Sequence, residues 1–168
     1  MALPLTRGVR SPDMAARSLA RTLLSQSRHG ALGTLLRADA DAPPVPVVTR
    51  VAVVPGENGW PLLLISALSL HAAALRADPA LSLLLGDVTA KGDPLTQPRL
   101  TLLGHARFLT MIEMVERDAL RTLWLSHQPK ARPYVDLPDF SFVAVDVAEA
   151  FLNGGFGLAY HLGIDDLK

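Results

Sequence analysis

Residues 61–85 have the sequence PLLLISALSLHAAALRADPALSLLL, and this stretch predicts a strand, a short helix and a second strand. Pro61–Ser66 is an apolar run that predicts the first strand. Ser69 is a residue type that caps helices, and the helix that follows must end before Pro79, because the residue before a proline avoids helical torsions. Ala80–Leu85 predicts a second, buried strand.

The residues before this stretch predict a helix followed by two strands. Ser11 can cap a helix and Pro12 suits its first position, so we predict a helix from Ser11 to the stop signal His29-Gly30. The two strands are predicted over residues 31–37 and 45–54, the second because it is rich in valine. Asn58-Gly59 favours a tight turn, which predicts a hairpin between strands 45–54 and 61–66.

The residues after this stretch predict two more strands and a longer helix. The strands are predicted over residues 99–109 and 140–151, with a loop over residues 86–98. Thr110 and Glu113 have the spacing of a capping box, which predicts a helix that ends near His127. Strands joined by short connections favour antiparallel pairing, so the pattern indicates an α+β, mainly β fold: a small closed barrel with helices outside.

Length and composition exclude several functional classes. A chain of 168 residues favours one domain, which we expect over residues 11–168 behind a loose arm of residues 1–10. Sixteen basic and sixteen acidic residues argue against nucleic acid or a membrane surface as a partner. The absence of cysteine excludes thiolate catalysis and cysteine zinc sites. The weakly apolar N-terminus does not resemble a signal peptide, so we expect a cytoplasmic protein.

Four stretches, taken in order and spacing, resemble the pyridoxamine 5′-phosphate oxidase-related FMN-binding proteins, and most closely their haem-utilisation branch. The four stretches are residues 31–35, residues 61–84, residues 99–106, and Asp139-Phe140 together with residues 154–157. The resemblance implies an FMN-binding split β-barrel, an antiparallel Greek-key-like barrel with flanking helices. It also implies a homodimer with the flavin site at the interface, where both subunits contribute.

The turn that opens the predicted helix at Ser69 is the candidate phosphate site. A helix start offers free backbone N–H groups and a partial positive charge, and Ser66, Ser69 and His71 add side-chain donors. In the resembling family this turn binds the FMN phosphate, with Ile65 among the flavin contacts. The resemblance adds Thr49, whereas Arg50 points either to the ligand or away, because neighbours on a strand face opposite sides.

Three alanines depart from the family pattern in this segment. Ala67 stands where a basic residue is common, and Ala72 and Ala74 stand where polar residues are common. Each departure removes a candidate hydrogen bond, worth about 1.5–3 kcal/mol when it is charge-assisted. Weak FMN binding and an empty site are therefore alternatives to a fully occupied one.

The flavin ring needs flat walls and a positive charge near its pyrimidine edge. The resemblance implies this role for Arg99 at the start of a strand. Gly155 allows close backbone approach, and Phe156 is a candidate cover for the ring or a substrate. No acid–base pair and no metal-ligand spacing stands out among the five histidines, so we expect no metal site. His161 alone is a candidate haem ligand.

Two functions remain open from the sequence. The first is an FMN-dependent oxidoreductase that acts on a small-molecule substrate, with FMN supplying the redox chemistry. The second is a non-enzymatic FMN- or haem-binding protein, a sensor, storage protein or carrier in haem utilisation. The sequence identifies neither the substrate nor the electron acceptor.

Overall fold

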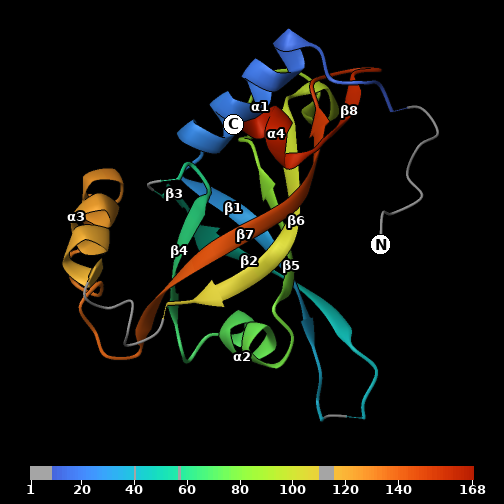
Figure 1. Ribbon diagram of the computed structural model, residues 1–168. Helices are drawn as coiled ribbons and strands as arrows, with labels where there is room; N and C mark the ends of the chain where they lie inside the picture. Colours follow the sequence, from blue (N-terminus) through green and yellow to red (C-terminus); the bar gives the residue numbers. More distant parts are fainter. Residues whose placement is uncertain (1–8, 40, 57, 110–115) are drawn as a thin grey trace.

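The computed structural model describes residues 9–39, 41–56, 58–109 and 116–168. In this part of the chain an antiparallel sheet curls into a half-barrel, and helices flank it (Figure 1). The sheet order is β2-β1-β5-β6-β7-β4-β3, and β8 pairs with β7 beside that path. The fold is therefore mainly β and antiparallel, as the sequence predicts.

The bounds of the elements follow the predicted order closely. The strands are β1 (His29–Leu36), β2 (Val45–Ala52), β3 (Val54–Pro55), β4 (Pro61–Ser66), β5 (Ala80–Leu85), β6 (Arg99–Phe108), β7 (Phe140–Asn153) and β8 (Ala159–Leu162). The helices are α1 (Met14–Gln26), α2 (Leu70–Ala77), α3 (Arg117–His127) and α4 (Ile164–Leu167), with short 3-10 turns at η1 (Pro94–Thr96) and η3 (Pro129–Ala131).

The strand–helix–strand prediction for residues 61–85 is confirmed. Ser69 caps α2, because its hydroxyl oxygen accepts a hydrogen bond from the Ala72 N–H. The first helix starts two residues later than predicted. Asp13 caps it in place of Ser11, since the Asp13 carboxylate accepts from the Ala16 N–H at 2.8 Å. A charged acceptor at this position forms the stronger cap.

The predicted hairpin between residues 45–54 and 61–66 is confirmed only next to its turn, where Val54 pairs with Leu62, and is wrong for the rest of its length. β2 pairs along its whole length with β1, and only the two residues of β3 pair with β4. The break falls at Val53, whose N–H bonds to the carbonyl of Arg28 instead of continuing into β4. The main partner of β4 is β7. Neither β8 nor α4 was predicted from the sequence.

Two predictions fall wholly or mainly outside the described residues. Thr110 and Glu113, the predicted capping box, lie in the undescribed residues 110–115, although α3 does end at His127 as expected. The predicted arm is described only from residue 9. Arg10 forms an isolated parallel bridge with Tyr160, and its N–H bonds to the carbonyl of Ala159 at 2.9 Å.

The longest strand, β7, joins the two ends of the half-barrel. Along one edge its residues 143–153 pair with β6. Along the other edge its first residues pair with β4 and its last residues with β8. With 14 residues it reaches roughly 40 Å along its path. Groups at its two ends therefore lie far apart in one chain.

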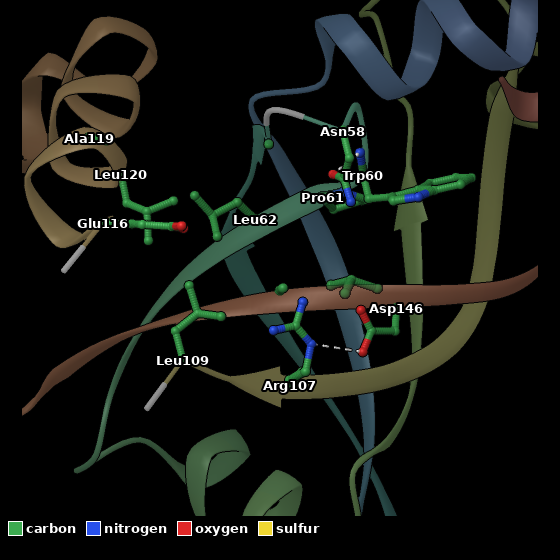
Figure 2. A pocket seen from close by; sticks show the side chains of 13 residues that line it. Asn58, Trp60, Pro61, Leu62, Arg107, Leu109, Glu116, Ala119, Leu120 and Asp146 are labelled. Atoms are coloured by element: carbon green, nitrogen blue, oxygen red, sulfur yellow. Dashed lines mark hydrogen bonds and ion pairs between the residues drawn. The ribbon is translucent and has the colours of Figure 1, made fainter. Parts of the chain in front are cut away.

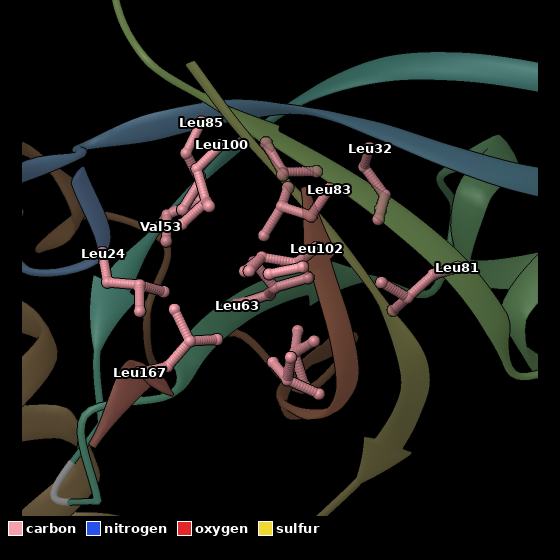
Figure 3. Packing of buried hydrophobic residues seen from close by; sticks show 14 of the residues in the cluster. Leu24, Leu32, Val53, Leu63, Leu81, Leu83, Leu85, Leu100, Leu102 and Leu167 are labelled. Carbon is pink, nitrogen blue, oxygen red and sulfur yellow. The ribbon is translucent and has the colours of Figure 1, made fainter. Parts of the chain in front are cut away.

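The hydrophobic core fills the inner face of the curled sheet. Leucines of β4, β5 and β6 point toward one another there (Figure 3). Helices α1, α2 and α4 close this core with Leu24, Leu75 and Leu167, each under 10% exposed. Burying such a leucine contributes about 1.5–3 kcal/mol each. The alternation along the strands then leaves every second residue on the outer face.

Helix α3 packs on the outer side of β4 and β7. Its Trp124 is fully buried, and its ring centroid lies 6.0 Å from that of Phe142 in an edge-on arrangement. Val54, Leu62, Ala131 and Val135 complete this second apolar cluster. Among the described residues, no helix has the length and apolar character needed to cross a membrane.

Candidate functional site

The predicted phosphate turn, residues 66–71, forms the connection between β4 and α2. The Ser69 hydroxyl lies 2.7 Å from the Ser66 carbonyl, to which it donates, and it also accepts from the Ala72 N–H. The Ser66 hydroxyl donates to the Asp139 carboxylate at 2.6 Å. Both hydroxyl hydrogens are therefore used inside the turn, and Asp139 brings a negative charge to it.

Thr49 and His71 come together at this turn, as the prediction of a joint site requires. Thr49 Oγ1 lies 3.0 Å from His71 Nδ1, and the two side chains share a hydrogen bond between β2 and the first turn of α2. Partial burial lowers the pKa of His71 below its ordinary value of 6.5, because removal from water disfavours the imidazolium. A neutral His71 offers a phosphate at most one N–H donor and no charge.

The other predicted residues of this segment lie on different surfaces. Ile65 is 1% exposed and belongs to the core, so its side chain does not reach a ligand at the surface. Arg50 points away from Thr49 because neighbours on a strand face opposite sides. It opposes Ala31 of β1 on the outer face of the sheet.

Arg99, Gly155 and Phe156 lie at the other end of the half-barrel. Arg99 opposes Asn153 at the last residue of β7, whereas Ser66 opposes Phe140 at its first. Figure 1 shows α2 at one end and β8 at the opposite end. The Arg99 guanidinium donates to the carbonyls of Leu95 and Gln97 in its own loop. One chain therefore does not bring these three residues to the α2 turn.

The outer face of β1, β2 and β5 carries a cavity of about 660 Å³. We call the surface of these three strands the outer face; it comprises His29, Ala31, Gly33, Leu35, Pro46, Val48, Arg50, Ala80, Ser82 and Leu84. Val48 is 71% exposed on it. Thr49 and Arg50 line the cavity, so it includes two of the residues predicted from the sequence.

Two histidines form pairs with carboxylates on the outer side of the sheet. His29 Nε2 lies 3.3 Å from Asp87 Oδ1, and both residues line the 660 Å³ cavity. His161 Nε2 lies 3.0 Å from Glu149 Oε2, and its ring stacks on Phe151 with centroids 4.9 Å apart. No group of three or more metal-binding side chains occurs in the described parts of the chain.

A second cavity, of about 440 Å³, lies beside α3 (Figure 2). Leu62, Leu109 and Leu120 give it apolar walls, and Arg107 pairs with Asp146 at 3.2 Å on its sheet side. None of the residues predicted from the sequence lines this cavity. A third hollow, of about 310 Å³, lies over Gly33 and Ser82 on the outer face.

Sequence reasoning missed three residues that the structure brings to these sites. Asp139 joins the α2 turn, and His29 and Asp87 meet at the cavity. Asp139-Phe140 was part of the family resemblance, which is a signal for its place but not for its contact with Ser66. Nothing in the spacing of His29 and Asp87 predicts their contact, because the sheet register alone brings β1 beside the end of β5.

Comparison with known proteins identifies the family. The family model described as CREG, beta-barrel matches residues 11–166, and the chain belongs to this family. A crystal structure from Clostridium acetobutylicum, assigned to the pyridoxinephosphate oxidase family, has the same fold, with a TM-score of 0.66 at 14% identity over 94% of this chain and 100% of that one. The resemblance to the pyridoxamine 5′-phosphate oxidase-related split barrels is thereby confirmed.

Two more similar proteins carry haem in their names. The chloroplastic Non-canonical heme oxygenase HOZ of Arabidopsis thaliana is 31% identical over 144 residues, which are 80% of this chain and 42% of that protein. The heme-binding protein of Mycobacterium smegmatis is 28% identical with a TM-score of 0.76, over 95% of this chain and 61% of that one. The chain thus spans less than two thirds of either protein.

The side chains that line the 660 Å³ cavity fit a haem better than the side chains at the α2 turn fit the phosphate of FMN. At the α2 turn the hydroxyl hydrogens are bonded internally and the Asp139 carboxylate would repel a dianion, so the turn offers a phosphate few donors and an unfavourable charge. A haem needs apolar surface, an imidazole and cations for its carboxylates. The 660 Å³ cavity supplies Val48, Leu84, His29 and Arg50.

Proposed function

We propose that this chain is a haem-binding protein of the split-barrel family. The observation that carries the proposal is the pairing of histidine with a carboxylate on the outer side of the sheet. Histidines that bind a metal commonly donate their second ring N–H to a carboxylate, which fixes the ring and raises its basicity. The haem-related names of the Arabidopsis and Mycobacterium relatives support the same cofactor.

Haem titration tests this function directly. Hemin is added in steps to the purified chain, and the Soret band is recorded against a buffer blank. We expect a shifted band that saturates at one haem per chain. A linear rise without saturation, the same as in the blank, would contradict haem binding. Loss of a saturated band on adding ascorbate in air would assign haem degradation as well.

The second candidate is an FMN-dependent oxidoreductase acting on a small-molecule substrate. The contact between Thr49 and His71 beside the N-terminus of α2 favours it, because both side chains stand where an anion would meet the helix start. Quenching of flavin fluorescence on titration with FMN tests this candidate. Saturation at one FMN per chain would support it, and unchanged fluorescence would contradict it.

We also propose a homodimer formed through the outer face, with the 660 Å³ cavity lying between the two subunits. Val48 and Leu84 are 71% and 38% exposed there, and large exposed apolar surfaces commonly mark interfaces. The hypothesis of an FMN site also requires a second subunit, since Arg99 and Phe156 lie far from the α2 turn of their own chain. If FMN binds, dilution to monomer should release it.

The test of the homodimer is the mass of the chain in solution. Val48→Asp places a charge on the outer face and should give a monomer in light scattering. Leu95→Asp is the matched control, because Leu95 is 70% exposed but lies in η1, away from the outer face. A monomeric unmodified chain would overturn the proposal.

A further inference from the structure

The 660 Å³ cavity on the outer face has the size and the composition of a binding site for a planar ligand. Sites for small molecules are typically about 300–1,000 Å³ and combine apolar walls with a few polar groups. Here Val48, Leu84 and Val88 supply apolar side chains. Val88 is 68% exposed, so the chain itself does not cover this wall.

His29 is the metal-binding group of this cavity. Its Nε2 contacts the Asp87 carboxylate at 3.3 Å, and within the described residues its other ring nitrogen makes no hydrogen bond. The carboxylate contacts Nε2 and restrains the ring, so Nδ1 is the nitrogen left available to a metal in this arrangement. The side chain of His29 is 50% exposed, which leaves the imidazole accessible from the cavity.

Arg50 supplies a positive charge to the same cavity. The register places it opposite Ala31, and its guanidinium forms no ion pair with any residue that the structure describes. A carboxylate of a ligand can therefore bind it without competing with a partner from the chain. Arginine binds carboxylates through two parallel N–H groups, which fixes their orientation.

His161 is the competing ligand, and its surroundings differ. Its ring stacks on Phe151 with an interplanar angle of 17°, so one face of the imidazole is covered. It lines none of the three cavities described above. Of the two histidine–carboxylate pairs in the described residues, the pair of His29 and Asp87 is thus the one that opens into a cavity.

We propose that haem binds in this cavity, where His29 would bind its iron and Arg50 would pair with one of its carboxylates. This inference rests on the haem-binding function proposed above. It names the site on this chain and identifies two residues of different roles, one for the iron and one for the periphery of the ring. Asp87 is then a positioning residue that acts through His29.

Matched histidine variants test the assignment. His29→Ala and His161→Ala are each titrated with hemin, with the Soret maximum, the electron paramagnetic resonance spectrum and the dissociation constant as readouts. We expect His29→Ala to change the ligation spectrum and to weaken binding, and we expect His161→Ala to behave as the unmodified chain. Free imidazole added to His29→Ala should restore the ligation spectrum. Circular dichroism checks that both variants are folded.

Two further variants separate the roles. Asp87→Asn should weaken haem binding by about 10–100-fold, the usual effect of removing the partner of a metal-binding histidine, and should shift the spectrum. Arg50→Gln should weaken binding by about tenfold or more and leave the ligation spectrum unchanged, because it removes only a charge-assisted contact. A changed spectrum in Arg50→Gln would contradict this division.

The outcomes distinguish a failure of the site assignment from a failure of the haem-binding function. If the unmodified chain shows no saturable Soret shift, the haem-binding function fails and this inference fails with it. If the unmodified chain binds haem and His29→Ala keeps its spectrum and affinity, the function stands and the site assignment is overturned. Loss of the ligation spectrum in His161→Ala alone would likewise move the site to β8.

Discussion

The Ser66 hydroxyl donates a hydrogen bond of 2.6 Å to the carboxylate of Asp139, a residue 73 positions later in the chain. The N–H of Ala67 also bonds to the carbonyl of Asp139 at 2.7 Å. Together these contacts fasten the end of β4 to the residue before β7. They also place a negative charge at the turn that the sequence predicts as the phosphate site.

Replacing Asp139 should therefore strengthen FMN binding. In Asp139→Asn the repulsion between the carboxylate and a phosphate disappears while a hydrogen bond to Ser66 remains available. We expect the affinity for FMN to rise by roughly tenfold, since two like unit charges about 4 Å apart repel by ~1–4 kcal/mol between bulk water and a protein surface. Fluorescence quenching measures it. Asp165→Asn, in α4 at the other end of the fold, is the control. Equal affinities would contradict the role of Asp139.

His71 should make stability depend on pH below 6.5. Burial lowers its pKa in the folded chain, so the unfolded chain binds the proton more tightly. This contribution is complete above pH 6.5 and is lost as the pH falls through the folded pKa. We expect His71→Gln to lose less stability than the parent between about pH 7.5 and about pH 5.5. Urea denaturation at both values tests this, and identical losses would exclude His71 as the cause.

Gly104 should not tolerate a side chain. A Cβ at this position would collide with the backbone carbonyl of Asp146, at the register shift between Leu103 and Gly104. We expect Gly104→Ala to lose about 1–3 kcal/mol of unfolding free energy, as overpacked sites do. Gly154→Ala is the control, because its Cβ would lie 3.5 Å from Leu19 and would meet no clash. Similar denaturation midpoints for the two variants would refute the prediction.

Trp124 should stabilise the protein through its volume and not through its indole N–H. The side chain is fully buried, and its Nε1 has no hydrogen-bond partner among the described residues. Trp124→Ala should cost about 3–5 kcal/mol, whereas Trp124→Phe should cost clearly less, because it keeps an aromatic ring against Phe142. Thermal or urea unfolding compares them. Equal losses would mean that the N–H has a partner after all.

Much of the fold could be read from local sequence patterns. The strand, helix and strand of residues 61–85 were predictable because apolar runs, a serine cap and a proline stop act over a few residues. The helix start was misplaced by two residues because Ser11 and Asp13 are both good caps and the choice between them depends on which side chain reaches an N–H.

The pairing of the strands could not be predicted from local sequence patterns. The valine-rich segment 45–54 and the Asn58-Gly59 turn both favour a hairpin, yet β2 pairs with β1 and β4 pairs with β7. The hydrogen bond from the Val53 N–H to the Arg28 carbonyl keeps this segment beside β1, and pairing with β4 is limited to Val54 and Pro55. Pairing is decided by which strands bury the core together, and that involves segments far apart in the chain.

The candidate site was likewise predictable from the sequence only in part. The sequence by itself determined the split-barrel family and the residue types at the α2 turn, since these rest on the order of local motifs. Only the tertiary structure decided that Ser66 bonds to Asp139, that Thr49 meets His71 while Arg50 lies on the outer face, and that His29 meets Asp87 at a cavity. The physical reason is that sheet register and the alternation of side chains determine these contacts, and both are fixed only when the strands pair in the folded sheet.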